Sequence, residues 1–270
     1  MARILAITNQ KGGVGKTTTA INLAASLAAA EVPTLLVDCD PQANASSGLG
    51  VTATGDQANL YPGLRGEAEA TDIIVATPMQ GLELLPASRD LVGLNLELVS
   101  EPDRERRLER LLAPLADRYG YIILDCPPAL DLLNLNALVA AHALIVPMQC
   151  EYFALEGVTQ LLATLTAVRG GWNPTLEIEG VLLTQLDERT NLSRQVADSL
   201  RQHFGDRIFQ TTIPRNIRLA EAPSHGLPAL LYDLRSRGAE AYLHLAHEVI
   251  QRDQARLPQQ PENAHSASTR

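Results

Sequence analysis

Two lysines, three glycines and two threonines between residues 11 and 18 could together bind phosphate. In order, these residues are Lys11, Gly12, Gly13, Val14, Gly15, Lys16, Thr17 and Thr18. Glycine lets the backbone adopt conformations that are unfavourable for residues with a Cβ. Successive N–H groups of such a loop can therefore approach phosphate oxygens. Apolar residues at 4–7 and an alanine-rich stretch at 17–30 predict a strand before the loop and a helix after it. This context favours a phosphate-binding loop over a turn that merely caps a helix.

The two lysines have different expected roles. In such loops the final lysine reaches the β- and γ-phosphates of a nucleotide, and the next hydroxyl ligates Mg²⁺, which here assigns Lys16 and Thr17. The usual pattern, G-x-x-x-x-G-K-[ST], has its first glycine where this chain has Gln10. Because Lys16 already serves the nucleotide of its own chain, we expect Lys11 to project outward, toward the phosphates of a second subunit.

Two further apolar stretches end in aspartates. Residues 34–37 lead into Asp38 and Asp40, and residues 121–124 lead into Asp125. Ligands of α/β proteins bind at the carboxyl ends of the strands, so these carboxylates are expected beside the phosphate loop. Either segment alone could be an ordinary strand end, and the phosphate loop is what favours a shared magnesium and nucleotide site.

The segment from Lys11 to Thr18 resembles the deviant Walker A motif of the ParA/MinD group of P-loop ATPases. Asp38-Cys39-Asp40-Pro41-Gln42 resembles the Walker A′ motif of that group, and the strand ending in Asp125 has the Walker B arrangement. Residues 149–157 and 213–224 resemble those of chromosomal ParA proteins of the Soj type. The resemblance extends over residues 2–252.

This resemblance implies an ATPase with ATP and Mg²⁺ as cofactors. ATP would close a sandwich homodimer in which Lys11 contacts the partner's nucleotide. Lys11, Lys16 and Asp40 would be the catalytic residues, with Asp40 orienting the attacking water. Thr17, Asp38 and Asp125 would surround the metal, and Pro214 and Asn216 would lie beside the adenine.

The resemblance also implies a role in segregating a chromosome or plasmid. The ATP-bound homodimer would bind double-stranded DNA without sequence specificity, through Arg189 and Arg218. Slow hydrolysis, stimulated by a ParB-type centromere-binding protein, would release it. The protein would be cytoplasmic and associated with the nucleoid when it is bound to ATP. Because the net charge is −9, any DNA-binding surface must be local.

Three positions depart from the family pattern. Ala43 stands where relatives commonly have glycine after the Walker A′ aspartates, which is tolerated if its backbone has a negative φ. Leu227 stands where a lysine often follows Ser-His-Gly, which removes a cation near the expected DNA surface. Gln185 replaces the lysine of the T-K-x-D motif with which related GTPases recognise guanine, so ATP is favoured.

Two other kinds of protein remain possible on the sequence. A metabolic P-loop kinase would use the same loop to phosphorylate a small molecule, but Lys11 and the D-x-D-P-Q segment argue against it. A nucleotide-dependent scaffold would dimerise with negligible turnover, but Lys16, Thr17 and Asp40 favour at least slow hydrolysis. The three cysteines lack C-x-x-C spacing, which indicates small buried residues rather than the cluster site of nitrogenase iron proteins.

The composition predicts a single α/β domain, a mostly parallel twisted sheet with helices on both faces. The chain has 270 residues, of which 46% are hydrophobic and only 4% aromatic, as expected for an aliphatic core between parallel strands. Further strands are expected at 82–85, 143–146, 178–183 and 208–212, and helices at 104–116, 155–168, 192–203 and 238–252. Residues 53–71 predict a loop or short helices.

The ATPase domain is expected to span residues 1–252, followed by a disordered polar tail at 258–270. The tail lacks the basic amphipathic helix with which MinD-type proteins bind membranes. No apolar stretch is long enough to span a bilayer, so no membrane partner is expected.

Overall fold

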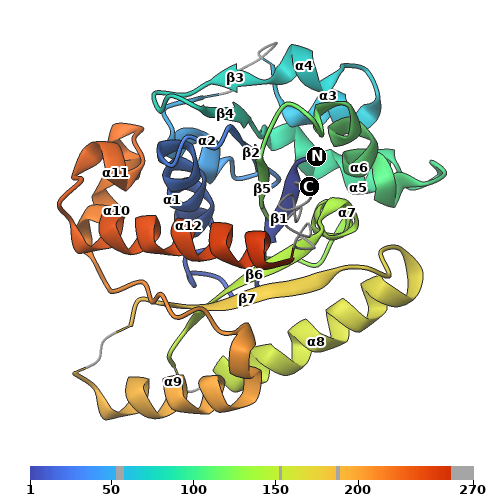
Figure 1. Ribbon diagram of the computed structural model, residues 1–270. Coiled ribbons are helices and arrows are strands. Elements are labelled where there is room, and N and C mark those ends of the chain that lie inside the picture. The colour runs from blue at the N-terminus through green and yellow to red at the C-terminus, as the bar shows by residue number, and fades with distance from the viewer. Residues whose placement is uncertain (53–57, 152–153, 187–188, 257–270) are drawn as a thin grey trace, which may run out of the picture.

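A seven-stranded sheet forms the centre of the computed structural model, which describes residues 1–52, 58–151, 154–186 and 189–256 (Figure 1). The strand order is β3-β4-β2-β5-β1-β6-β7, and every neighbouring pair is parallel except β3 and β4 at one edge. The strands are β1 (Arg3–Ile7), β2 (Thr34–Asp38), β3 (Val75–Ala76), β4 (Leu82–Leu85), β5 (Tyr121–Asp125), β6 (Ala143–Gln149) and β7 (Glu177–Thr184).

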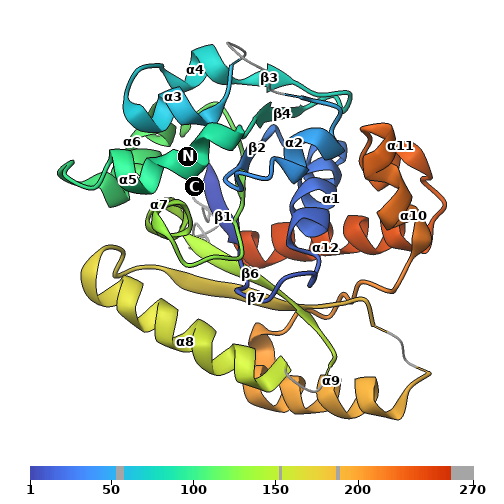
Figure 2. The same ribbon diagram turned by 180° about the vertical axis from the view of Figure 1, so that it is seen from behind.

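Helices cover both faces of the sheet (Figures 1 and 2). One face packs against α1 (Lys16–Ala29), α2 (Asn44–Gly48), α10 (Ile217–Glu221), α11 (Ala229–Tyr232) and α12 (Arg237–Arg256). The other packs against α3 (Leu60–Arg65), α4 (Ala70–Ile73), α5 (Leu94–Glu97), α6 (Arg107–Leu112), α7 (Leu132–Ala140), α8 (Ala154–Gly171) and α9 (Asn191–Phe204). The expected single α/β domain with helices on both faces is confirmed.

Alternating strand residues separate the two cores. Leu36 of β2 packs on the side of α1 and α12, whereas its neighbours Leu35 and Val37 pack on the opposite side. All five residues of β2 are buried, and the same holds for β5. A sheet covered on both faces needs such continuous aliphatic strands, which explains the low aromatic content.

The register of the central strands determines which side chains meet at their carboxyl ends. Asp38 of β2 is the partner of Asp125 of β5, and Asp125 is also paired with Ile7, the last residue of β1. The loop from Ile7 to α1 therefore begins beside both aspartates. Three segments that are far apart in the sequence converge at this edge.

One expected strand is absent and one expected helix is broken. Residues 208–212 make only an isolated bridge, between Ile208 and Val181. The Phe209 N–H donates to the Val181 carbonyl of β7, but the N–H groups of Gln210 and Thr211 donate to the Glu248 carboxylate of α12 instead of to a strand. The helix expected at 104–116 is divided into a 3₁₀ turn, the short α6 and a second 3₁₀ turn that contains Pro114, whose ring cannot continue a helix.

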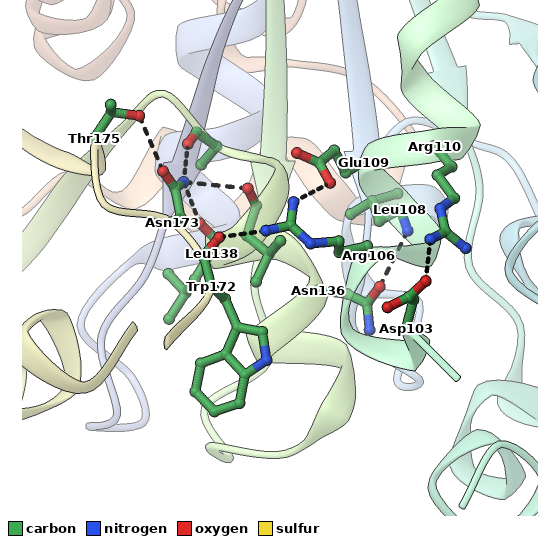
Figure 3. A network of polar contacts seen from close by, with 12 residues as sticks. Asp103, Arg106, Leu108, Glu109, Arg110, Asn136, Leu138, Trp172, Asn173 and Thr175 are labelled. Carbon is green, nitrogen blue, oxygen red and sulfur yellow. Dashed lines mark hydrogen bonds and ion pairs between the residues drawn. The ribbon is translucent and has the colours of Figure 1, made fainter. Parts of the chain in front are cut away.

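A polar network on the α7 side joins the segment before β7 to α6 and α7 (Figure 3). The buried Asn173 amide donates to the carbonyls of Leu138, Val139 and Ala141, at the carboxyl end of α7. These carbonyls have no partner within the helix, so the amide satisfies them. Arg106 donates to the Trp172 carbonyl and to Glu109, which links the same turn to α6.

The remaining expectations have mixed outcomes. The three cysteines are buried and unpaired, as expected. Residues 53–71 include α3 and the start of α4, but residues 53–57 and the tail expected at 258–270 lie outside the described residues. No described helix is both long and apolar enough to cross a membrane. Helix α7 and the antiparallel edge strand β3 were not expected from the sequence.

Candidate nucleotide site

The phosphate loop connects β1 to α1, as its sequence predicts. Gly15 is the N-cap of α1 with a φ of 88°, and Gly13 has a φ of 75°. These left-handed conformations favour glycine because they have no steric cost without a Cβ. Gly12 does not adopt a positive φ, so the expected glycine-only backbone holds for two of the three glycines. Helix α1 begins at Lys16 and directs its N-terminus toward the loop.

The Lys16 side chain lies inside the loop. Its Nζ donates to the Lys11 carbonyl at 3.1 Å, and the residue is only 7% exposed. Burial lowers the pKa of Lys16, an effect opposed by the charges of Asp125 and Asp40. The cation is therefore positioned before any phosphate arrives.

The Lys11 side chain points elsewhere. Its Nζ lies 2.7 Å from the Glu151 carboxylate just beyond β6, and the side chain is 39% exposed. Its backbone N–H donates to Asn9 Oδ1, which fixes the start of the loop. The two lysines of one loop thus occupy different environments, one buried and one at the surface.

Asp38 is completely buried and accepts three hydrogen bonds. Its Oδ2 accepts from the Ser46 N–H at 2.8 Å and hydroxyl at 2.7 Å, and its Oδ1 accepts from the Asp40 N–H at 3.2 Å. Burial raises the pKa of Asp38 to about 6, although the Ser46 bonds oppose the shift. Ser46 was not predicted from the sequence, because a serine in a short helix gives no sign of its partner.

Asp125 is equally buried, but neither carboxylate oxygen has a hydrogen-bond partner in the described structure. Burial, and then the charge of Asp38, raise the pKa of Asp125 well above its usual value. The nearby Thr17 hydroxyl opposes this rise in pKa, although it does not form a hydrogen bond of good geometry with either carboxylate oxygen. A buried carboxylate without partners is suited to a cation, so Asp125 with Thr17 fits a Mg²⁺ ion, directly or through water.

A cavity of about 560 Å³ opens beside the loop. Its walls include Gly12, Gly13, Gly15, Lys16, Thr17, Thr18, Asp40, Gln42, Pro127, Asp131 and Gln185. Asp40 is 8% exposed and accepts from the Gln42 N–H at 2.9 Å, which orients its carboxylate at the cavity. The described residues hold no group of three or more His, Cys, Asp or Glu suited to a metal alone.

A second cavity, of about 540 Å³, shares Gly15, Thr18 and Gln185 with the first. Its other walls include Pro214, Asn216, Ile213, Leu219 and Tyr242. Apolar and amide side chains beside a phosphate cavity are suited to a nucleobase. Pro214 and Asn216, which the sequence assigns to the adenine, both line this second cavity.

The two arginines assigned to DNA lie in different surroundings. Arg189 lines a cavity of about 820 Å³ together with Arg215, Arg237 and His244. Arg218 does not line that cavity. Its guanidinium forms ion pairs with Glu221 at 2.8 Å and Asp233 at 3.2 Å.

Ala43 is the N-cap of α2 with a φ of 53°. The condition under which this alanine would be tolerated freely, a negative φ, is not met, because the turn after Asp40 takes the left-handed conformation that a glycine would adopt freely. The Ala43 N–H still donates to the Asp40 carbonyl at 2.8 Å, which closes the turn. The substitution is accommodated in the fold with backbone strain.

The family comparison agrees with this geometry. The AAA domain family matches residues 2–178. The chromosome partitioning protein ParA of Caulobacter vibrioides is 52% identical over 256 residues, covering 94% of this chain and 96% of that protein. The sporulation initiation inhibitor protein Soj of Bacillus subtilis is 53% identical over 249 residues, covering 92% and 98%. The chain belongs to the ParA/Soj family of chromosome-partitioning ATPases.

Solved structures show the same fold with nucleotides bound. Cobyrinic acid a,c-diamide synthase of Mycobacterium smegmatis, solved with an ATP analogue and magnesium, is 36% identical with a TM-score of 0.83. The match covers 94% of this chain and 97% of that one. The septum site-determining protein MinD of Pyrococcus horikoshii, solved with Mg-ADP, is 30% identical with a TM-score of 0.76, covering 92% and 96%. Membership of the ParA/Soj family favours an ATPase over a metabolic kinase.

Proposed function

We propose that this protein is an ATP-dependent DNA-partitioning switch. ATP and Mg²⁺ drive formation of a homodimer, the homodimer binds DNA without sequence specificity, and hydrolysis releases it. The observation that carries the proposal is the separation of the two lysines: Lys16 is buried beside the phosphate cavity, whereas Lys11 is at the surface. A surface cation at the mouth of a nucleotide site is free to exchange an intramolecular carboxylate for the phosphates of a second subunit.

Mg²⁺ would be held by the Thr17 hydroxyl, by Asp125 and by the nucleotide phosphates, with Asp38 in support. When bound there, Mg²⁺ would supply positive charge against the charge that develops on the phosphates during hydrolysis. Lys16 contacts the β- and γ-phosphates. Asp40, whose carboxylate lines the cavity, orients the attacking water.

The DNA-binding surface is proposed to lie at the cavity lined by Arg189, Arg215 and Arg237. Three guanidinium groups provide local positive charge on a chain whose net charge is −9. Arg215 and Arg237 have no ion-pair partner among the described residues. Arg218 already pairs with two carboxylates, so we expect it to contribute less than Arg215 or Arg237.

The nucleoid association of the ATP-bound form and the stimulation by a ParB-type centromere-binding protein belong to the same proposal. Family membership supports both. The proposed unit is the ATPase domain of residues 1–252, acting in the cytoplasm.

The Asp40→Ala protein tests the switch, because it should bind ATP without hydrolysing it. We expect a stable dimer with ATP that binds random-sequence duplex DNA, and no such binding with ADP or without nucleotide. Fluorescence anisotropy at two salt concentrations measures the DNA affinity, and light scattering measures the mass. The affinity should fall steeply with salt, because DNA binding of this kind releases counterions.

Lys11→Ala, combined with Asp40→Ala, is the matched control. It should bind ATP as a monomer and should not bind DNA. A monomeric Asp40→Ala protein in saturating ATP would contradict the sandwich dimer. A dimer that forms with ATP but does not bind DNA would support the nucleotide switch and contradict DNA as its target.

A further inference from the structure

Two glutamine side chains converge on one carbonyl of the phosphate loop. Gln185 Nε2 donates to the Gly13 carbonyl at 2.9 Å, and Gln149 Nε2 donates to the same oxygen at 3.1 Å. Gln149 is the last residue of β6, and Gln185 directly follows β7. The ends of two neighbouring strands therefore hold one peptide group of the loop from outside.

The next peptide group is held in a similar way. The Thr184 hydroxyl, at the end of β7, donates to the Val14 carbonyl at 2.8 Å, and this bond is buried. In a trans peptide the N–H points away from the C=O. Fixing the carbonyls of Gly13 and Val14 toward β6 and β7 therefore turns the N–H groups of Val14 and Gly15 to the opposite side of the loop. Those are the groups with which such a loop binds phosphate.

Gln185 also has an unusual backbone. Its φ is 51°, in the left-handed region that is unfavourable for a residue with a Cβ. The backbone is stabilised on its far side, where the Leu186 N–H donates to the Ile213 carbonyl at 3.1 Å. Strain of this kind persists where the surrounding structure fixes the residue, and here it accompanies a side chain that lies between the phosphate and base cavities.

We propose that Gln149 and Gln185 are positioning residues that orient the Gly13 peptide and so shape the loop for phosphate before nucleotide binds. The inference depends on the nucleotide site alone and not on DNA binding or dimerisation. Pre-shaping reduces the ordering that binding would otherwise require. Because both amides share one acceptor, each should partly replace the other when one is lost.

Gln185→Met and Gln149→Met test the proposal, since methionine has a similar length but neither a donor nor a charge. We expect each single substitution to weaken the binding of ADP and ATP about three- to tenfold, the range for one lost hydrogen bond. The double variant should lose more than the product of the single effects. Titrations followed by the fluorescence of labelled ADP and labelled ATP give the dissociation constants. Steady-state kinetics should show a raised KM, with kcat within about twofold of that of the natural protein.

Gln202→Met, on the exposed face of α9, is the matched control and should change neither constant. Gln185→Gly relieves the backbone strain but lacks the side-chain amide. It should therefore weaken nucleotide binding as much as Gln185→Met does, while its melting temperature is unchanged or higher. Unchanged nucleotide affinity in the folded double variant would overturn the proposal. So would a loss of affinity that follows the melting temperature alone.

Discussion

Two regions differ in how their charged groups are held: the phosphate edge, where the phosphate loop meets the strand ends at Asp38 and Asp125, and the arginine cavity, lined by Arg189, Arg215 and Arg237. At the phosphate edge, Lys16, Asp38 and Asp125 are almost completely buried, and Lys16 and Asp38 are fixed by hydrogen bonds. In the arginine cavity, Arg215 and Arg237 are exposed and have no ion-pair partner among the described residues. Buried and oriented charge is suited to chemistry on one ligand, whereas exposed and adaptable charge is suited to the proposed DNA surface, which would not need to distinguish sequences.

The difference also appears in the free energy of folding. Burying two neighbouring carboxylates destabilises the native state, because their charged forms lose hydration and repel each other. Exposed arginines have no such cost. The phosphate edge is therefore a region where function opposes stability, and the arginine cavity is not.

Asp125→Asn should give the largest effect and tests that opposition directly. Without nucleotide or metal, we expect the variant to be about 1–3 kcal/mol more stable at pH 8, because the buried charge is lost without losing any hydrogen bond. The pKa of Asp125 is higher in the native than in the unfolded state, so the contribution of this group to native stability is most favourable at low pH and is lost as pH rises through the native pKa.

The gain from Asp125→Asn should therefore diminish toward pH 4. Urea denaturation at pH 4, 6 and 8 measures it, and Mg²⁺-dependent ATPase activity should fall in the same variant. A variant less stable than the natural protein at pH 8 would mean that the carboxylate has an unseen stabilising partner.

Arg237→Ala tests the other side of the comparison. In the Asp40→Ala background with ATP, we expect DNA affinity to fall by about 1 kcal/mol and the salt slope to decrease by about 1, as for one lost phosphate contact. The melting temperature should not change. Arg110→Ala, an exposed arginine of α6 paired with Asp103, is the control and should leave DNA binding unaltered.

Ala43→Gly should give the smallest effect. A left-handed alanine costs about 1–2 kcal/mol, partly offset by the greater freedom of glycine in the unfolded chain, so we expect a net stabilisation of about 0.5 kcal/mol. Ala29→Gly, at the end of α1, should be destabilising instead. Thermal denaturation measures the change in stability of both variants. Equal destabilisation of the two would show that the turn after Asp40 is not strained.

Prediction from the sequence succeeded where local pattern determines structure. The order strand, loop, helix around Lys16 and the strands ending in Asp38 and Asp125 are as predicted. It failed where a distant group competes. Residues 208–212 are apolar enough for a strand, but the carboxylate of Glu248, 37 residues beyond Thr211, accepts from the N–H groups of Gln210 and Thr211. The φ of Ala43 could not be read from its residue type, because alanine alone favours a negative φ.

The sequence by itself determined the chemistry of this protein: a phosphate loop with two lysines, three aspartates at strand ends and an aliphatic α/β core. Residue types and short spacings suffice for this, because the loop and each strand end are continuous in the chain. Only the tertiary structure decided which groups meet. The unpartnered Asp125 and the two glutamines on Gly13 depend on the register of parallel strands, whose neighbours in space are far apart in sequence.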